Sequence, residues 1–237
     1  MPFVYPIPDL LPVELAREIR AALDRPDTDW VDGRGSAGRD AAKKRNRELK
    51  PDSELRRSLS AMIGRHLSDL TQPGGRALYT NAEPVRWSDF LFSRTTEGGG
   101  YGDHMDNHIM PVGGGGMRSD MSMTVFLSDP SEYEGGELVI DSDMGFAPRF
   151  KLPIGSAVLY STLAVHRVAP VTAGERVVAL TWIESRWRDP LSRQLNADLL
   201  ECLGLVAQQS GIEAPVKDRL IVKLEKVRGI LQKRDGS

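Results

Sequence analysis

The feature that most restricts the fold is a series of short segments, between about Leu78 and Glu184, in which polar and apolar residues alternate with a period of two. Glycines separate these segments, as expected for strands joined by turns. The clearest alternating runs are 122–127, 137–140, 157–160 and 176–183. Because no helical pattern separates one strand from the next, the sequence favours an antiparallel barrel or jelly roll over a parallel sheet.

Helical patterns flank this β region on both sides. Residues 12–25 carry apolar side chains at near-helical spacing with a proline at each end, and a second amphipathic helix begins at Ser53. From about Pro190 the pattern is helical again. We therefore expect an α+β fold with a mainly β core. The chain divides into an N-terminal helical support region (1–77), a β core (78–188) and a C-terminal helical region (189–237).

The composition narrows the class of partner. A chain of 237 residues with a net charge of −2 has no basic excess, so we expect neither nucleic acid nor a membrane as its partner. Prolines break the N-terminal segment 1–8, which predicts neither a signal peptide nor a membrane span. The single cysteine, Cys202, cannot build a disulfide framework and is expected in the core or at its boundary. We expect a cytoplasmic protein.

His104 and Asp106 form a His-x-Asp pair, and His166 follows much later in the chain. Residues two apart in a strand point to the same face, so the pair can project into the barrel together, and His166 can reach it from another strand. Two imidazoles and one carboxylate are the ligand set that leaves open coordination positions on a non-haem Fe(II). The pattern predicts an iron centre at which chemistry takes place.

Arg176 begins an alternating run in which it shares a face with the apolar residues Val178 and Leu180. A guanidinium in such a place requires an anionic partner, and its planar shape suits a carboxylate. 2-Oxoglutarate would bind the metal through its 1-carboxylate and 2-oxo group and leave its distal carboxylate for Arg176. One cosubstrate thus explains both features.

Simpler readings compete with this hypothesis. A structural barrel without a metal also fits the strand pattern, and His104 and His108 have the four-residue spacing of a helical zinc site, although Met105 replaces the glutamate of that motif. His108 is expected at the pocket rim or in solvent. Four further features are interpreted as follows: His66 as a histidine at a helix boundary, the basic cluster 39–50 as a solvated face, Arg118 and Asp120 as a rim ion pair or substrate contacts, and Trp182 as a core residue.

Short motifs along most of the chain carry a resemblance to a known family. They are Trp30-Val31-Asp32-Gly33-Arg34, Tyr101-Gly102 with His104, Asp106 and Asn107, Arg118-Ser119-Asp120, Thr124-Val125-Phe126-Leu127-Ser128, Tyr133-Glu134-Gly135-Gly136-Glu137-Leu138, Lys151-Leu152-Pro153, Val158-Leu159-Tyr160, His166-Arg167-Val168, Pro170-Val171-Thr172, Arg176 and Trp182. In this order and at these separations, the chain resembles the PKHD-type hydroxylases, a bacterial group of Fe(II)/2-oxoglutarate dioxygenases related to the prolyl 4-hydroxylases.

The resemblance implies a double-stranded β-helix (a cupin-like jelly roll) with iron held by His104, Asp106 and His166. It implies that Arg176 binds 2-oxoglutarate and that the enzyme hydroxylates a small-molecule or amino-acid-like substrate with O2, ascorbate being a candidate stimulant. The alternatives are a non-catalytic cupin-like sensor of a metal or organic acid, and a zinc hydrolase. The C-terminal helices either pack on the barrel or pair two subunits in a homodimer.

This chain departs from its relatives at three places. Thr95 stands where they commonly have tyrosine, so we expect a hydrogen bond to the cosubstrate either to be altered or to be supplied by another group. Ser161 stands where proline is usual. The glycine-rich segment 111–117, which contains Gly113 to Gly116, is expected to act as a lid or to reshape the substrate mouth.

Overall fold

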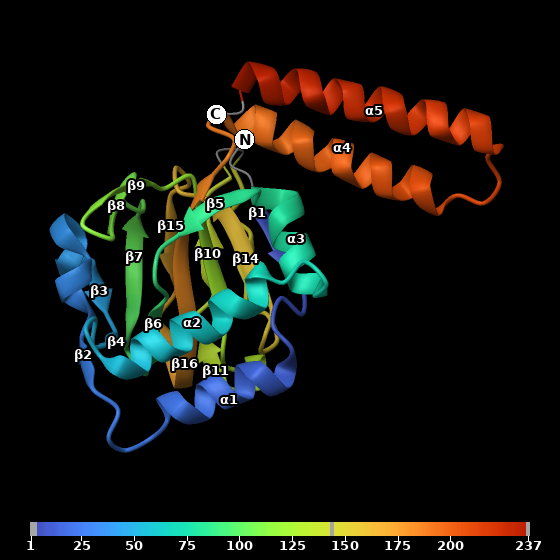
Figure 1. The fold of residues 1–237 in the computed structure, drawn as a ribbon. Coiled ribbons are helices and arrows are strands. Elements are labelled where there is room, and N and C mark those ends of the chain that lie inside the picture. Colours follow the sequence, from blue (N-terminus) through green and yellow to red (C-terminus); the bar gives the residue numbers. More distant parts are fainter. Residues whose placement is uncertain (1–3, 143–144, 236–237) are drawn as a thin grey trace.

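Two antiparallel sheets form the centre of the computed structural model, which describes residues 4–142 and 145–235 (Figure 1). The strands of the larger sheet lie in the spatial order β1 (Val4–Ile7), β14 (Ala157–Ser161), β10 (Met121–Phe126), β16 (Val171–Ser185), β6 (Leu91–Thr96), β4 (Arg47–Leu49) and β2 (Trp30–Asp32). Two further strands, β5 (Pro84–Trp87) and β11 (Tyr133–Gly135), also pair with β16. The smaller sheet has the order β13 (Arg149–Phe150), β12 (Leu138–Ile140), β15 (His166–Val168), β7 (Gly100–His104), β3 (Lys44–Arg45). The predicted α+β fold with a jelly-roll core is confirmed.

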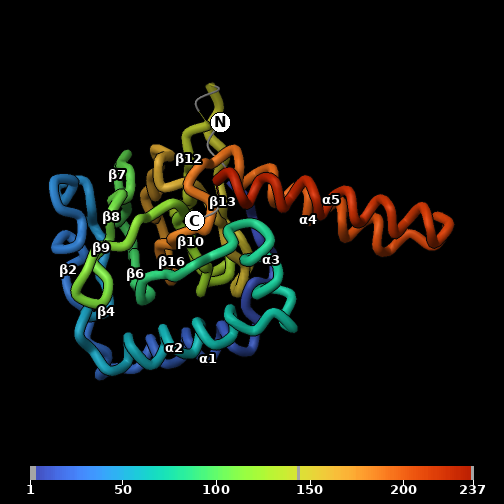
Figure 2. Tube along the Cα trace, turned by 45° about the horizontal axis from the view of Figure 1, so that its top comes forward, coloured from blue at the N-terminus to red at the C-terminus, as the bar shows by residue number. Residues whose placement is uncertain are grey.

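Successive side chains along the strands of the larger sheet point to opposite faces, so each face of the sheet has its own apolar layer. On β10, Met123 and Val125 face α1 (Val13–Leu23) and α2 (Glu54–Ser68), whose buried residues Ile19 and Ile63 belong to the same core cluster. Figures 1 and 2 show these two helices lying side by side along the sheet. The other face of the sheet, with Phe126, Val158, Tyr160 and Val178, is buried toward the smaller sheet. The site therefore lies on the face that the helices do not cover.

The two predicted N-terminal helices are present, but a third was missed. Leu78, which we expected to begin the strand region, lies in α3 (Pro73–Ala82), and the first strand after it is β5. Gly74 and Gly75 are residues more typical of a turn than of a helix interior. They are needed for close packing instead, because a Cβ at Gly74 would come within 1.9 Å of the Leu10 carbonyl oxygen. The predicted boundary at 77/78 falls inside this helix, and region 1–77 also supplies strands β1 to β4.

The C-terminal region forms a helical hairpin of α4 (Pro190–Gln208) and α5 (Ala214–Asp235), which projects from the β core (Figures 1 and 2). Leu199 and Leu231 of the hairpin are buried in one cluster with Trp187. Cys202 is exposed on α4 rather than in the core, because only one face of a projecting helix finds a partner. The remaining short elements are three 3-10 helices, Gly33–Ser36, Gly38–Lys43 and Pro130–Glu132, and the two-stranded sheet of β8 (Ile109–Val112) and β9 (Gly115–Arg118).

Candidate active site

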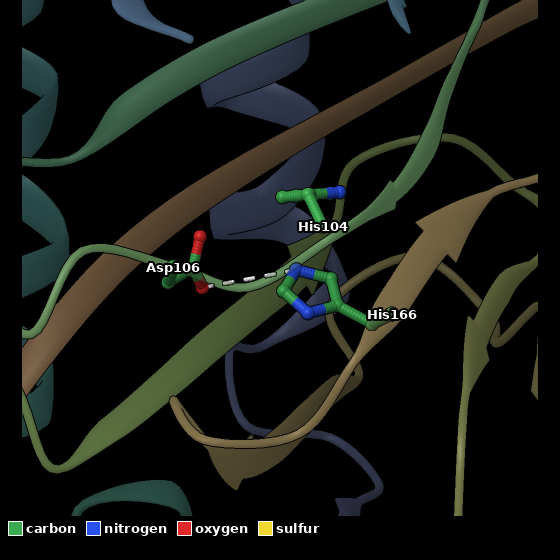
Figure 3. Close-up of side chains that lie close together, drawn as sticks. All are labelled: His104, Asp106 and His166. Atoms are coloured by element: carbon green, nitrogen blue, oxygen red, sulfur yellow. Dashed lines mark ion pairs between the residues drawn. The ribbon is translucent and has the colours of Figure 1, made fainter. Parts of the chain in front are cut away.

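His104, Asp106 and His166 converge between the sheets (Figure 3). One ligand-type atom from each lies within 4.8 Å of the others, and His166 Nε2 is 3.8 Å from Asp106 Oδ2. Such separations suit three ligands around one metal ion, because metal–nitrogen and metal–oxygen bonds are each about 2.0–2.2 Å long. The donor set also fits the 2-His-1-carboxylate arrangement that non-haem Fe(II) takes.

Strand pairing explains why the two histidines meet. β15 pairs with β7 so that His166 stands directly opposite His104, and directly opposed residues in an antiparallel pair project to the same face. Their ring centroids are 4.2 Å apart. Residues 62 positions apart are thus neighbours, as the sequence hypothesis required.

Asp106 is positioned by a loop, not by the strand that we predicted. We expected His104 and Asp106 on one strand, but β7 ends at His104 and Asp106 lies in the loop that follows. Ser122, which lies on the inward-facing side of β10, donates a hydrogen bond of 2.5 Å to Asp106 Oδ2. The orientation of the carboxylate therefore depends on Ser122, a residue that strand alternation placed but that sequence analysis did not assign to the site.

Backbone carbonyls fix which nitrogen of each imidazole faces the centre. His104 Nδ1 lies 2.8 Å from the Gly102 carbonyl oxygen, and His166 Nδ1 lies 3.0 Å from that of Ala164. A carbonyl oxygen only accepts, so each Nδ1 carries the proton and each Nε2 keeps a lone pair, the form that binds a metal. Burial, followed by the proximity of His166, lowers the pKa of His104 to about 4. This imidazole is neutral at pH 7.

Aromatic rings hold the imidazoles in place. The Tyr101 ring stacks on His104 with centroids 3.5 Å apart, and Tyr160 meets the edge of His166 at 4.9 Å. The Tyr160 hydroxyl is 3.4 Å from His166 Nε2. Burial raises the pKa of Tyr101 to about 12, so this ring stays uncharged beside the centre.

Arg176 lies in the same cavity and is buried, with 3% of its surface exposed. Among the described residues, no carboxylate lies within ion-pair distance of its guanidinium, and its Nε has no hydrogen-bond partner. Burial lowers the pKa of Arg176, whereas the neighbouring Tyr133 hydroxyl acts in the opposite direction. A buried cation without an anion carries an unfavourable desolvation energy that a carboxylate ligand would offset. This is the environment that the sequence predicted for a 2-oxoglutarate arginine.

The cavity that holds these groups has a volume of about 1100 Å³. Thr95 and Thr124 both line it. The register of β6 and β16 pairs Thr95 with Arg176, whereas Thr124 on β10 lies opposite Leu180, four residues further along β16. Tyr133 interacts with Arg176 through its hydroxyl but does not line the cavity. Sequence analysis assigned a role to Thr95 but to neither Thr124 nor Tyr133.

Other predicted residues fall partly where expected. His108 is exposed at the cavity wall, and Arg118 forms an ion pair with Asp120 at 2.8 Å, as predicted. Trp182 was wrongly placed in the core: it is half-buried and lines the cavity, because it continues the inward-facing series of β16. Segment 111–117 lies within the hairpin of β8 and β9, where Gly113 and Gly114 have φ values of +57° and +79°.

The fold and the site define a class of enzyme. Residues 90–184 match the family model of the 2OG-Fe(II) oxygenase superfamily. Two solved structures share the fold. A prolyl hydroxylase from Trichoplax adhaerens, in complex with a peptide fragment of hypoxia inducible factor, has a TM-score of 0.55 at 15% identity, covering 77% of this chain and 83% of that chain. HygX from Streptomyces hygroscopicus, with nickel and 2-oxoglutarate bound, has a TM-score of 0.52 at 17% identity, and the match covers 78% of this chain and 85% of HygX. The protein is a 2OG-Fe(II) oxygenase with a jelly-roll fold.

Curated relatives identify the family more closely. A PKHD-type hydroxylase of Stenotrophomonas maltophilia (strain R551-3) is 39% identical over 192 residues, which is 80% of this chain and 81% of the relative. A PKHD-type hydroxylase of Nitrobacter winogradskyi is 36% identical over 217 residues, covering 90% and 92%. The chain belongs to the PKHD-type hydroxylases. In the described residues, no helix has the length and apolarity that crossing a bilayer requires.

Proposed function

We propose that this chain hydroxylates a C–H group of a small-molecule or amino-acid-like substrate, that His104, Asp106 and His166 hold its iron, and that Arg176 binds the distal carboxylate of 2-oxoglutarate. Succinate and CO2 would be the co-products. The observation that supports this best is the presence, in one cavity, of a metal-ligand triad and a buried arginine without an anion.

Fe(II) and 2-oxoglutarate, when bound, would supply the chemistry by which O2 oxidises a C–H group. The protein positions the substrate and excludes water from the site. The Gly102 and Ala164 carbonyls keep both imidazoles in the ligating tautomer, and Ser122 keeps the carboxylate turned toward them. If Asp106 holds the iron as proposed, it would fill the position that a halide would need in a halogenating relative. Hydroxylation is therefore the reaction that we propose.

At the other end of the cosubstrate, Arg176 would give charge-assisted hydrogen bonds to the distal carboxylate. Phe126 lies against the guanidinium, with the arginine Cζ 5.7 Å from its ring centroid. The apolar walls around this pocket strengthen each of these contacts, because they lower the local dielectric constant.

The test is succinate formation from 2-oxoglutarate under O2, with Fe(II) and ascorbate, screened against pools of small metabolites, free amino acids and short peptides. The product should gain the mass of one oxygen atom. The Asp106→Ala variant is the control and should form no succinate. A sensor module would bind Fe(II) and 2-oxoglutarate without forming succinate, and a zinc hydrolase would act without 2-oxoglutarate; either result would reject the proposal.

A further inference from the structure

A second arginine, Arg56, lines the cavity without an ion-pair partner. It lies in the first turn of α2, where the Ser53 hydroxyl accepts a hydrogen bond from its backbone N–H at 3.2 Å. Its Nε donates to the Phe90 carbonyl oxygen at 2.8 Å, which fixes the plane of the guanidinium. No described carboxylate lies within 4.0 Å of it, so its two terminal nitrogens are available to a ligand.

The neighbouring charges do not explain this arginine. Asp89, Glu48 and Asp52 are the acidic groups that favour its charged form, but none is bonded to it. Glu48 is already paired with Lys44 in a buried contact, and Asp89 is exposed at the cavity wall. Arg56 is thus a half-buried, oriented cation at the wall of a cavity, and no described carboxylate forms an ion pair with it.

The sheet register places Arg56 and Arg176 at opposite ends of the cavity. Arg176 pairs with Thr95 on β6, whereas Arg56 is bonded to Phe90, which precedes the other end of that strand. Five residues of strand separate these points, or about 17 Å. The triad lies toward the Arg56 end, because Ser122, which donates a hydrogen bond to Asp106, stands opposite Trp182 in the register of β10 and β16.

Trp182 adds a second unsatisfied group at the end where Arg56 lies. Its backbone carbonyl oxygen accepts from Ser88 N–H at 3.0 Å, two residues before Phe90. Its indole Nε1 is buried and has no acceptor, although the ring lines the cavity. A buried N–H without an acceptor is unfavourable, so a ligand that accepts there gains affinity.

We infer that Arg56 is the substrate-carboxylate site of this enzyme, with the Trp182 indole N–H as a second contact. This inference rests on the proposed function, since Arg176 is then occupied by the cosubstrate. The substrate is a carboxylic acid of amino-acid-like size, held by its carboxylate at Arg56 with a C–H group directed toward the triad. Arg56 would be a binding residue that determines specificity rather than a catalytic residue.

The inference is tested by titrating the full-length protein, loaded with Fe(II) and 2-oxoglutarate without O2, with N-acetyl amino acids and their matched C-terminal amides. Calorimetry gives both dissociation constants for each pair. The acid should bind at least about tenfold more tightly than its amide, because a charge-assisted contact to the guanidinium is lost in the amide. The Arg56→Gln variant should bring this ratio to about one, and Arg56→Lys should restore part of it.

Arg57→Gln is the matched control, because Arg57 is exposed on the same helix and does not line the cavity. It should keep the full acid preference. Trp182→Phe should weaken binding of acid and amide alike without changing their ratio. An absent preference in the unaltered protein, or one that survives in Arg56→Gln, overturns the inference. 2-Oxoglutarate binding in the same samples tests the proposed function separately: its failure would reject both, whereas intact 2-oxoglutarate binding without acid preference would reject only the inference.

Discussion

Replacing Arg176 by methionine should have two opposite effects. Methionine keeps much of the side-chain volume and removes the buried charge that has no anion in the described structure. Without cosubstrate, neutral and well-packed side chains in place of buried ionic groups are often stabilising, by about 1–3 kcal/mol. For a chain of 237 residues this corresponds to a rise in Tm of about 3–9 °C.

Binding of 2-oxoglutarate should change in the other direction. A bidentate, charge-assisted contact to the distal carboxylate contributes about 2–4 kcal/mol, so the dissociation constant should rise about 30-fold to 1000-fold. Thermal unfolding of the metal-free protein and anaerobic titration of the Fe(II)-loaded protein measure the two effects. Phe126→Leu, which alters the ring beside the guanidinium but no charge, is the control for packing and should keep most of the affinity.

The two measurements together separate a ligand-binding arginine from a structural one. If Arg176 mainly supported the fold, its replacement would lower Tm and leave 2-oxoglutarate affinity nearly unchanged in the protein that remains folded. That combination would refute the reasoning. A higher Tm with unchanged affinity would show that the charge is costly but that the cosubstrate binds elsewhere.

Three further predictions concern the triad. Asp106→Ala or His166→Ala should abolish Fe(II)-dependent succinate formation while circular dichroism shows a folded protein, and full turnover in either would remove that residue from the metal site. Ser122→Ala should weaken Fe(II) binding about 10-fold to 100-fold through loss of the hydrogen bond to Asp106, and metal titration would show no change if that bond did not matter. Burial lowers the pKa of His104 from 6.5 to about 4, so the unfolded chain binds more protons between these values. Stability of the metal-free protein should fall as pH drops through this window, by about 3 kcal/mol at most, and the dependence should be weaker in His104→Asn.

The local periodicity of the sequence was enough to predict α1, α2 and the main strands. In each of these elements, the apolar residues repeat with the period of the structure that buries them, as with Ile19 on α1 and Met123 on β10. α3 was missed because Gly74 and Gly75 weaken the helical pattern. Gly74 is required by its close contact with the Leu10 backbone, and Leu10 is too distant in the sequence for this contact to be inferred from it.

The candidate site shows the same division. His104, Asp106, His166 and Arg176 were named from residue type and spacing, because few arrangements leave a carboxylate and two imidazoles available for a metal. The elements that position these side chains were only partly predictable. β7 ends before Asp106, so the carboxylate is oriented by the hydrogen bond from Ser122 and not by a strand. Short-range patterns do not contain that information.

The sequence by itself determined the class of fold, the chemical identity of the candidate metal-binding groups and the presence of an inward-facing arginine, because these depend on residue type and on periods of a few residues. Only the tertiary structure decided which polar groups without a bonding partner lie in the same cavity. Antiparallel register sets His166 opposite His104 and places Arg56 and Arg176 at opposite ends of β6. Register depends on pairing between segments far apart in the chain, and its energy is distributed over the whole sheet rather than encoded at any one position.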